Sequence, residues 1–103
     1  MPEGVGPPYR VVYSEAVRNA LKALCERAAR GSRGEEILSA VRTIDEQLRS
    51  DPLGFGDPWH DLPAARLTVM IRVFPPLVVS YAVHKEKPVV FVKHFRPFPP
   101  DAF

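Results

Sequence analysis

Apolar residues recur every three or four positions in two neighbouring segments, residues 14–30 and 34–50. This spacing collects them on one side of a helix, so the pattern predicts two amphipathic helices. Ser14 is a suitable N-cap for the first helix, and Pro52 ends the second. The short link between them indicates an antiparallel hairpin. The predicted buried residues are Val17, Ala20, Leu21, Leu24 and Ala28, followed by Ile37, Leu38, Val41, Ile44 and Leu48.

Short runs of β-branched and aromatic residues predict four strands, one before the helices and three after them. The last three are joined by links of two and four residues, as antiparallel neighbours usually are. In the final run, alternation places His94 and Arg96 on the same face as Val92. The four predicted strands cover residues 9–13, 66–74, 77–84 and 89–96.

Between the helices and the last three strands, residues 51–65 are rich in proline, glycine and aspartate. We expect a loop there, with the rings of Phe55 and Trp59 plugging one end of the core. The element order β-α-α-β-β-β then predicts an α+β fold, in which the helical hairpin packs on one face of an antiparallel sheet. Residues 9–98 form the single domain, between a flexible arm at 1–8 and an irregular tail at 99–103.

Positive charge is concentrated in the strand-rich half of the chain. Residues 1–65 carry eight basic and ten acidic side chains, a net charge of −2. Residues 66–103 carry six basic and two acidic side chains, a net charge of +4. This asymmetry favours an anionic partner, either nucleic acid or an acidic protein segment, and the alternative is a solvated sheet surface.

Several classes of protein do not fit the sequence. The longest mainly apolar run, residues 67–83, contains Arg72 and is too short to cross a membrane. The N-terminus lacks the features of a secretory signal, and the single cysteine, Cys25, is typical of a cytoplasmic protein. Three scattered histidines and the lack of a phosphate-binding glycine loop predict neither a metal nor a cofactor.

Two segments, YRVVYSEAVRNALKAL and PLVVSYAVHKEKPVVFVKHFR, with the two-helix interval between them, resemble the RelE/ParE toxin superfamily over residues 9–98. This family belongs to bacterial type II toxin–antitoxin and plasmid stabilisation systems. The resemblance implies the fold described above and a protein held inactive by an antitoxin. RelE-type members are ribosome-dependent endoribonucleases, or mRNA interferases, whereas ParE-type members inhibit gyrase.

The chain is a divergent match, because Thr68 and Met70 stand where RelE-like chains often carry lysines. Cleavage through the 2′-hydroxyl of RNA needs an acid, a base and cations around the charged intermediate. His94 has the chemistry of an acid or base and Arg96 that of a charge-stabilising group, so these two are the catalytic candidates. The candidates for RNA or anion binding are Arg66, Arg72, Lys93 and Arg96.

Two functions remain open from the sequence. In the first, a toxin-like protein binds the translating ribosome or its messenger RNA and is neutralised by an antitoxin, with RNA cleavage left undecided. In the second, the chain is a non-enzymatic protein-interaction domain, a homodimer or a partner-binding module, which keeps the fold without toxicity. A neighbouring reading frame for a DNA-binding antitoxin would favour the first function.

Overall fold

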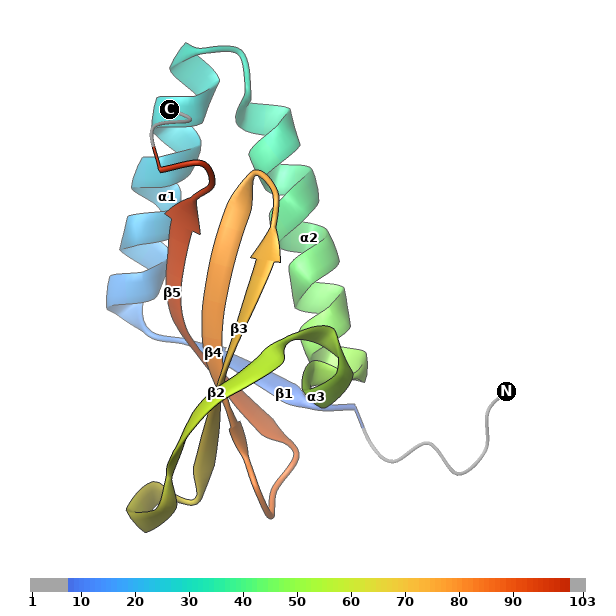
Figure 1. Cartoon of the computed structure of the whole chain (residues 1–103). Coiled ribbons are helices and arrows are strands. Elements are labelled where there is room, and N and C mark those ends of the chain that lie inside the picture. The colour runs from blue at the N-terminus through green and yellow to red at the C-terminus, as the bar shows by residue number, and fades with distance from the viewer. Residues whose placement is uncertain (1–7, 101–103) are drawn as a thin grey trace.

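The computed structural model describes residues 8–100, in which two long helices cover one face of a five-stranded sheet (Figure 1). The predicted α+β fold, a helical hairpin packed on a sheet, is therefore confirmed. The elements in chain order are β1 (Arg10–Tyr13), α1 (Glu15–Arg30), α2 (Gly34–Ser50), α3 (Pro52–Phe55), β2 (Asp57–Leu62), the 3-10 helix η1 (Pro63–Ala65), β3 (Leu67–Phe74), β4 (Leu77–His84) and β5 (Val89–Pro97).

The sheet is mixed, with the spatial order β1-β5-β4-β3-β2. All pairs of neighbours are antiparallel except β1 and β5, which run parallel from Arg10 opposite Val89 to Tyr13 opposite Val92. The expectation of a purely antiparallel sheet is thus wrong at one edge. A tight turn fixes the direction of β4 relative to β5, but β1 reaches β5 only through the helical hairpin, which imposes no antiparallel pairing.

The segment predicted as a loop contains a strand, β2, along the second edge of the sheet. Its pairing with β3 skips one residue between Pro58 and His60, so Trp59 lies in a β-bulge. The proline is tolerated because the strand is at the edge. Phe55 is buried in the core as predicted, whereas Trp59 is 60% exposed, so its expected role as a plug is wrong.

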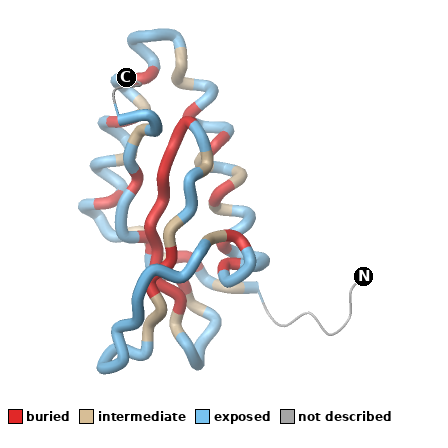
Figure 2. The backbone as a smooth tube through the Cα atoms, in the orientation of Figure 1, coloured by how far each residue is buried: buried red, intermediate tan, exposed pale blue. Residues whose placement is uncertain are grey.

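The core lies between the helices and the covered face of the sheet. Strand β4 is buried from Leu77 to Val83, and Figure 2 shows it as a continuous buried segment through the centre of the molecule. Most of the predicted helical residues are in this core, but Ala20 is exposed and Leu38 is 51% exposed. The buried helical residues are Val17, Leu24 and Ala28 from α1, and Ile37, Ala40, Ile44 and Leu48 from α2.

A buried tyrosine ties the short helix α3 to the sheet. The Tyr81 hydroxyl donates a hydrogen bond of 2.5 Å to the carbonyl oxygen of Pro52, and its ring lies 6.4 Å from that of Phe55. A Cβ atom added at Gly56 would lie 2.6 Å from the same hydroxyl, so only glycine fits there without rearrangement. Burial raises the pKa of Tyr81 to about 12. This contact fixes the start of β2.

The predicted N-terminal arm, apart from Pro8, lies outside the described residues, as does the tail from residue 101 onward. Within residues 8–100, no helix is both long enough and apolar enough to cross a membrane.

Truncation of the buried helical residues should destabilise the fold. Leu24→Ala and Ile44→Ala should each lower the free energy of unfolding by about 2–5 kcal/mol, because each leaves a cavity between the hairpin and the sheet. Leu38→Ala, on the exposed side of α2, is the matched control and should change it by no more than about 0.5 kcal/mol. Urea titrations measure all three values, and equal losses for Leu38 and Ile44 would contradict the packing described here.

Burial of Tyr81 predicts a loss of stability at alkaline pH. The unfolded chain releases this phenolic proton near the ordinary pKa of 10.0, whereas the folded state keeps it until a pH of about 12. The resulting stabilisation is complete below pH 10 and is lost as the pH rises from about 10 to 12. Tyr81→Phe should show a shallower decline of the free energy of unfolding over this range. Parallel declines for the two proteins would contradict the prediction.

Candidate functional site

A β-bulge in β5 decides which side chains lie on the open face of the sheet, the face away from the helices. Tyr81 pairs with Val92 and Ser80 with His94, so Lys93 has no partner in β4. The extra residue interrupts the alternation, because Val92 and Phe95 both belong to the core. His94 and Arg96 therefore share the open face, as predicted for the two together, but they do not share a face with Val92.

On this open face, two exposed rings flank a histidine and an arginine of β5. Phe91 is 38% exposed and Phe98, just beyond the strand, is 40% exposed. His94 and Arg96 lie between them in the sequence, and both are exposed. The backbone N–H of Phe98 donates to the carbonyl oxygen of Pro76 at 2.8 Å, which holds the residues after β5 against the β3–β4 turn.

The open face is hollowed at both ends of β5. At the C-terminal end of the strand, a hollow of about 470 Å³ has Arg96 on its wall and an apolar lining that includes Val73 and Phe98. At the opposite end, a pocket of about 480 Å³ is lined by Arg10, His84, Lys87 and Phe91, among others. Sequence reasoning missed Arg10 and Lys87, since only the parallel pairing of β1 with β5 brings these distant positions together.

The four residues predicted to bind an anion do not form one patch. Arg72 points to the helix side, where its Nη1 donates to the carbonyl oxygen of Phe55 at 3.0 Å and its guanidinium lies 5.0 Å from the centre of that ring. Arg66 forms an ion pair with Glu86. Lys93 is the extra residue of the bulge, and with His94 it lines a pocket of about 160 Å³ beside α1. Only Arg96 shares the open face with His94.

His94 is exposed, and its side chain also lines the small pocket beside α1. Its partner across the sheet is Ser80, and its imidazole makes no side-chain hydrogen bond to another residue in the range 8–100. Catalytic histidines are usually oriented by a second group, and phosphodiester cleavage needs an acid as well as a base. Exposed rings beside a histidine and an arginine are instead suited to contacts with bases and phosphates.

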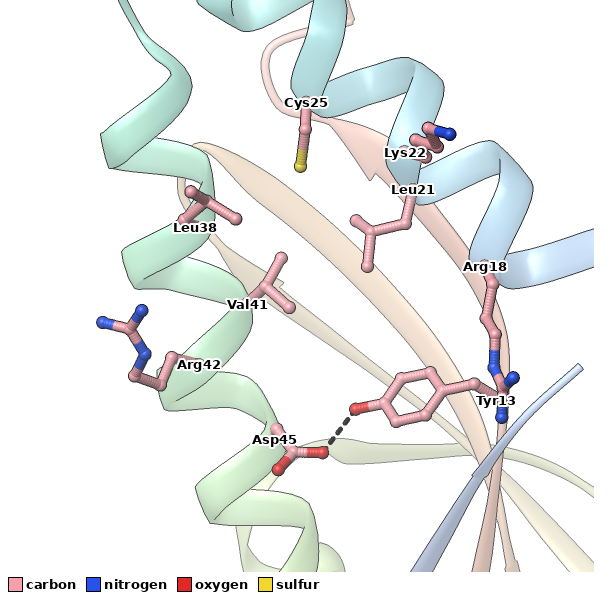
Figure 3. A pocket seen from close by; sticks show the side chains of 9 residues that line it. All are labelled: Tyr13, Arg18, Leu21, Lys22, Cys25, Leu38, Val41, Arg42 and Asp45. Atoms are coloured by element: carbon pink, nitrogen blue, oxygen red, sulfur yellow. Dashed lines mark hydrogen bonds between the residues drawn. The ribbon is translucent and has the colours of Figure 1, made fainter. Parts of the chain in front are cut away.

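A second concave surface, the helix groove, lies between α1 and α2 (Figure 3). It has a volume of about 650 Å³ and a mostly apolar lining. Burial raises the pKa of the Cys25 thiol, so this side chain is protonated at neutral pH and contributes apolar surface. The apolar residues that line the helix groove are Leu21, Cys25, Leu38 and Val41.

One end of the helix groove is closed by a hydrogen-bonded group. The Tyr13 hydroxyl donates to Asp45 Oδ1 at 2.6 Å, as Figure 3 shows, and Arg49 Nε donates to Asp45 Oδ2 at 2.7 Å. Burial would raise the pKa of Asp45, but the hydrogen bonds from Arg49 and Tyr13 outweigh it and lower that pKa. Asp45 is therefore ionised at neutral pH and already engaged by these two partners.

Uncompensated positive charge lines both sides of the helix groove. Arg18 and Lys22 extend from α1 and Arg42 from α2. None of the three forms an ion pair with another residue of the described range 8–100. The positions of Arg18 and Lys22 in the sequence do not show that they flank a concave surface, because the second helix forms its other side. The groove thus combines an apolar floor with a basic rim.

Comparisons of this chain with protein-family models, curated proteins and solved structures find no match. The resemblance to RelE/ParE toxins therefore stays a prediction from the sequence. Among the described residues, no three histidine, cysteine or acidic side chains form a group that could hold a metal ion. The open face of the sheet and the helix groove are therefore the two candidate binding surfaces.

Proposed function

We propose that this chain is a toxin-like cytoplasmic protein of the RelE/ParE kind, which binds single-stranded RNA across the open face of its sheet. The target would be the messenger RNA of a translating ribosome. The observation that carries the proposal is the series Phe91, His94, Arg96 and Phe98, which the bulge at Lys93 aligns on one exposed face. Exposed rings on which bases stack, next to basic side chains that contact phosphates, are the usual arrangement for binding single strands.

In this proposal, the aromatic rings stack on bases, whereas the polar side chains contact phosphates. A base stacked on an exposed ring contributes about 1–3 kcal/mol and needs no specific sequence. Arg96, on the wall of the hollow that contains Phe98, can donate two parallel hydrogen bonds to one phosphate. His94 adds a hydrogen-bond donor between the two rings. Because the open face carries no part of the core of the hairpin, RNA can bind without disturbing the packing of the helices.

Strong RNA cleavage is not part of the proposal. His94 lacks an orienting partner among the described residues, and Arg72 lies on the other side of the sheet, where it cannot assist Arg96. Loss of one well-placed charge donor typically lowers a rate by a hundredfold or more, about 3 kcal/mol. We therefore place His94 and Arg96 in RNA binding, and any catalytic role for them is secondary.

Substitution of open-face residues should weaken RNA binding. Arg96→Ala and Phe91→Ala should each raise the Kd for a short single-stranded RNA about fivefold to a hundredfold, as expected for a lost phosphate contact or a lost stacked ring. Arg96→Ala should also flatten the dependence of Kd on salt. Fluorescence anisotropy at several salt concentrations measures both effects, and a denaturing gel of the same samples should show intact RNA.

Arg72→Ala is the matched control, because it removes the same charge from the helix side of β3. It should leave the Kd nearly unchanged. An equal loss of affinity for Arg72→Ala and Arg96→Ala would mean that only net charge matters, and it would remove the open face as the RNA site. Rapid cleavage abolished by His94→Ala would instead make His94 catalytic.

A second candidate function, a protein-interaction domain, is favoured by the helix groove. An apolar floor with Arg18 and Lys22 on one side and Arg42 on the other complements an amphipathic helix that has acidic residues beside its apolar stripe. A second copy of the chain would bring these cations against each other, so the charge favours an acidic partner. In the toxin-like protein this partner is an antitoxin-like segment; in an interaction domain it is the main ligand.

The helix groove should bind an acidic amphipathic peptide. The double variant Arg18→Ala with Lys22→Ala should raise the Kd about tenfold for a synthetic helical peptide that has Leu in its apolar stripe and Glu beside it. Arg27→Ala with Arg30→Ala is the control, since it removes two cations of α1 that do not line the groove. Isothermal titration calorimetry compares them. Equal losses in the two double variants would contradict groove docking, and peptide binding without RNA binding would favour the second function.

A further inference from the structure

A pocket at the edge of the open face combines basic side chains from separate elements with an aromatic wall. It has a volume of about 480 Å³ and lies where the start of β1 meets the turn between β4 and β5. Arg10 comes from β1, His84 from the end of β4, Lys87 from the turn and Phe91 from β5. A volume of this order is sufficient for a nucleotide-sized ligand.

Among the described residues at this end of the sheet, basic side chains that do not line the pocket are paired with carboxylates. Arg66 forms an ion pair with Glu86, and Lys85 Nζ lies 3.2 Å from Asp61 Oδ2. Arg10 and Lys87, which line the pocket, form no ion pair with any residue in the described range 8–100. The uncompensated charge is therefore concentrated at the pocket, where an anion would meet two cationic side chains.

The third polar group of the pocket is held in one orientation. Nδ1 of His84 accepts hydrogen bonds from the backbone N–H groups of Glu86 and Lys87, at 3.0 and 3.1 Å. A ring nitrogen that accepts two hydrogen bonds carries no proton, so the neutral imidazole has its proton on Nε2. His84 thereby offers a fixed N–H donor, and the same two bonds order the turn that carries Lys87.

We infer that this pocket binds the terminal phosphate of an RNA strand, with the terminal base stacked on Phe91. A terminal phosphate monoester carries close to two negative charges near neutral pH and has three accepting oxygens, whereas an internal diester carries one charge. Arg10, Lys87 and the Nε2–H of His84 match that charge and number of acceptors. The inference rests on the proposed RNA-binding face, because Phe91 belongs to both the pocket and that face.

The test compares short RNAs, about eight nucleotides long, that end in a phosphate at the 5′ or the 3′ end or in hydroxyl groups only. By fluorescence anisotropy, a terminal phosphate at one end should lower the Kd about tenfold. Arg10→Ala with Lys87→Ala should abolish this preference and change the Kd of the hydroxyl-ended RNA far less. Arg66→Ala with Lys85→Ala removes two charges from the same end of the sheet and should keep the preference.

Small ligands separate this inference from the RNA-binding proposal. Adenosine monophosphate should raise the melting temperature of the protein, and adenosine should not. Phe91→Leu should weaken the binding of adenosine monophosphate and leave the binding of inorganic phosphate unchanged. Monophosphate binding that depends on Arg10 and Lys87, without RNA binding, would support the pocket and overturn the RNA-binding face. No preference for a terminal phosphate and no effect of the monophosphate, or equal losses in both double variants, would overturn the pocket.

Discussion

Strand β4 is buried on both faces, and this constraint organises the rest of the molecule. A strand without access to water must find a backbone partner on each side and an apolar cover on each face. Its neighbours β3 and β5 supply the partners, and the α1–α2 hairpin covers one face. On the other face, the small side chains of Ser80 and Ala82 are also buried.

The bulge at Lys93 decides which side chains of β5 the packing leaves on the open face. Without it, strict alternation would place both Phe95 and Lys93 on the face of Phe91, and His94 with Arg96 in the core. One extra residue restores Phe95 to the core and releases the two polar side chains to the open face. The cost of one unpaired residue in the ladder is offset by avoiding the burial of a guanidinium, which would be far more expensive. The sheet thus carries a basic and aromatic surface while its core remains apolar.

Much of the fold was predictable because local patterns encode it. Apolar residues recurring every three or four positions, among them Leu24 and Ile44, were sufficient to show which side of each long helix is buried. The alternating runs located β3, β4 and β5. Strand β2 was not predictable, since its residues show no alternation and it is held by pairing with β3 and by bonds from Thr68 and Lys85 to Asp61. The bulge was also hidden, because a single inserted residue leaves the composition of a strand unchanged.

The candidate site was predicted only in part, for a similar reason. His94 and Arg96 were found because they are neighbours in one strand. The groups around the edge pocket come from β1 and from the β4–β5 turn, and only the parallel pairing of β1 with β5 unites them. Likewise, nothing in the local sequence around Arg72 shows that Phe55 holds it on the opposite side of the sheet. Which cations act together is decided by tertiary structure.

The outer edge of β2 has a consequence for how copies of the protein behave at high concentration. Exposed edge strands are templates for pairing with other chains, and long, flat, apolar edges lead to fibrous aggregates. In β2, Pro58 has no N–H to offer a new strand, the bulge at Trp59 twists the ladder, and Asp57 adds negative charge. A neighbouring copy would therefore gain few backbone hydrogen bonds here, which disfavours edge-to-edge pairing of two chains along β2.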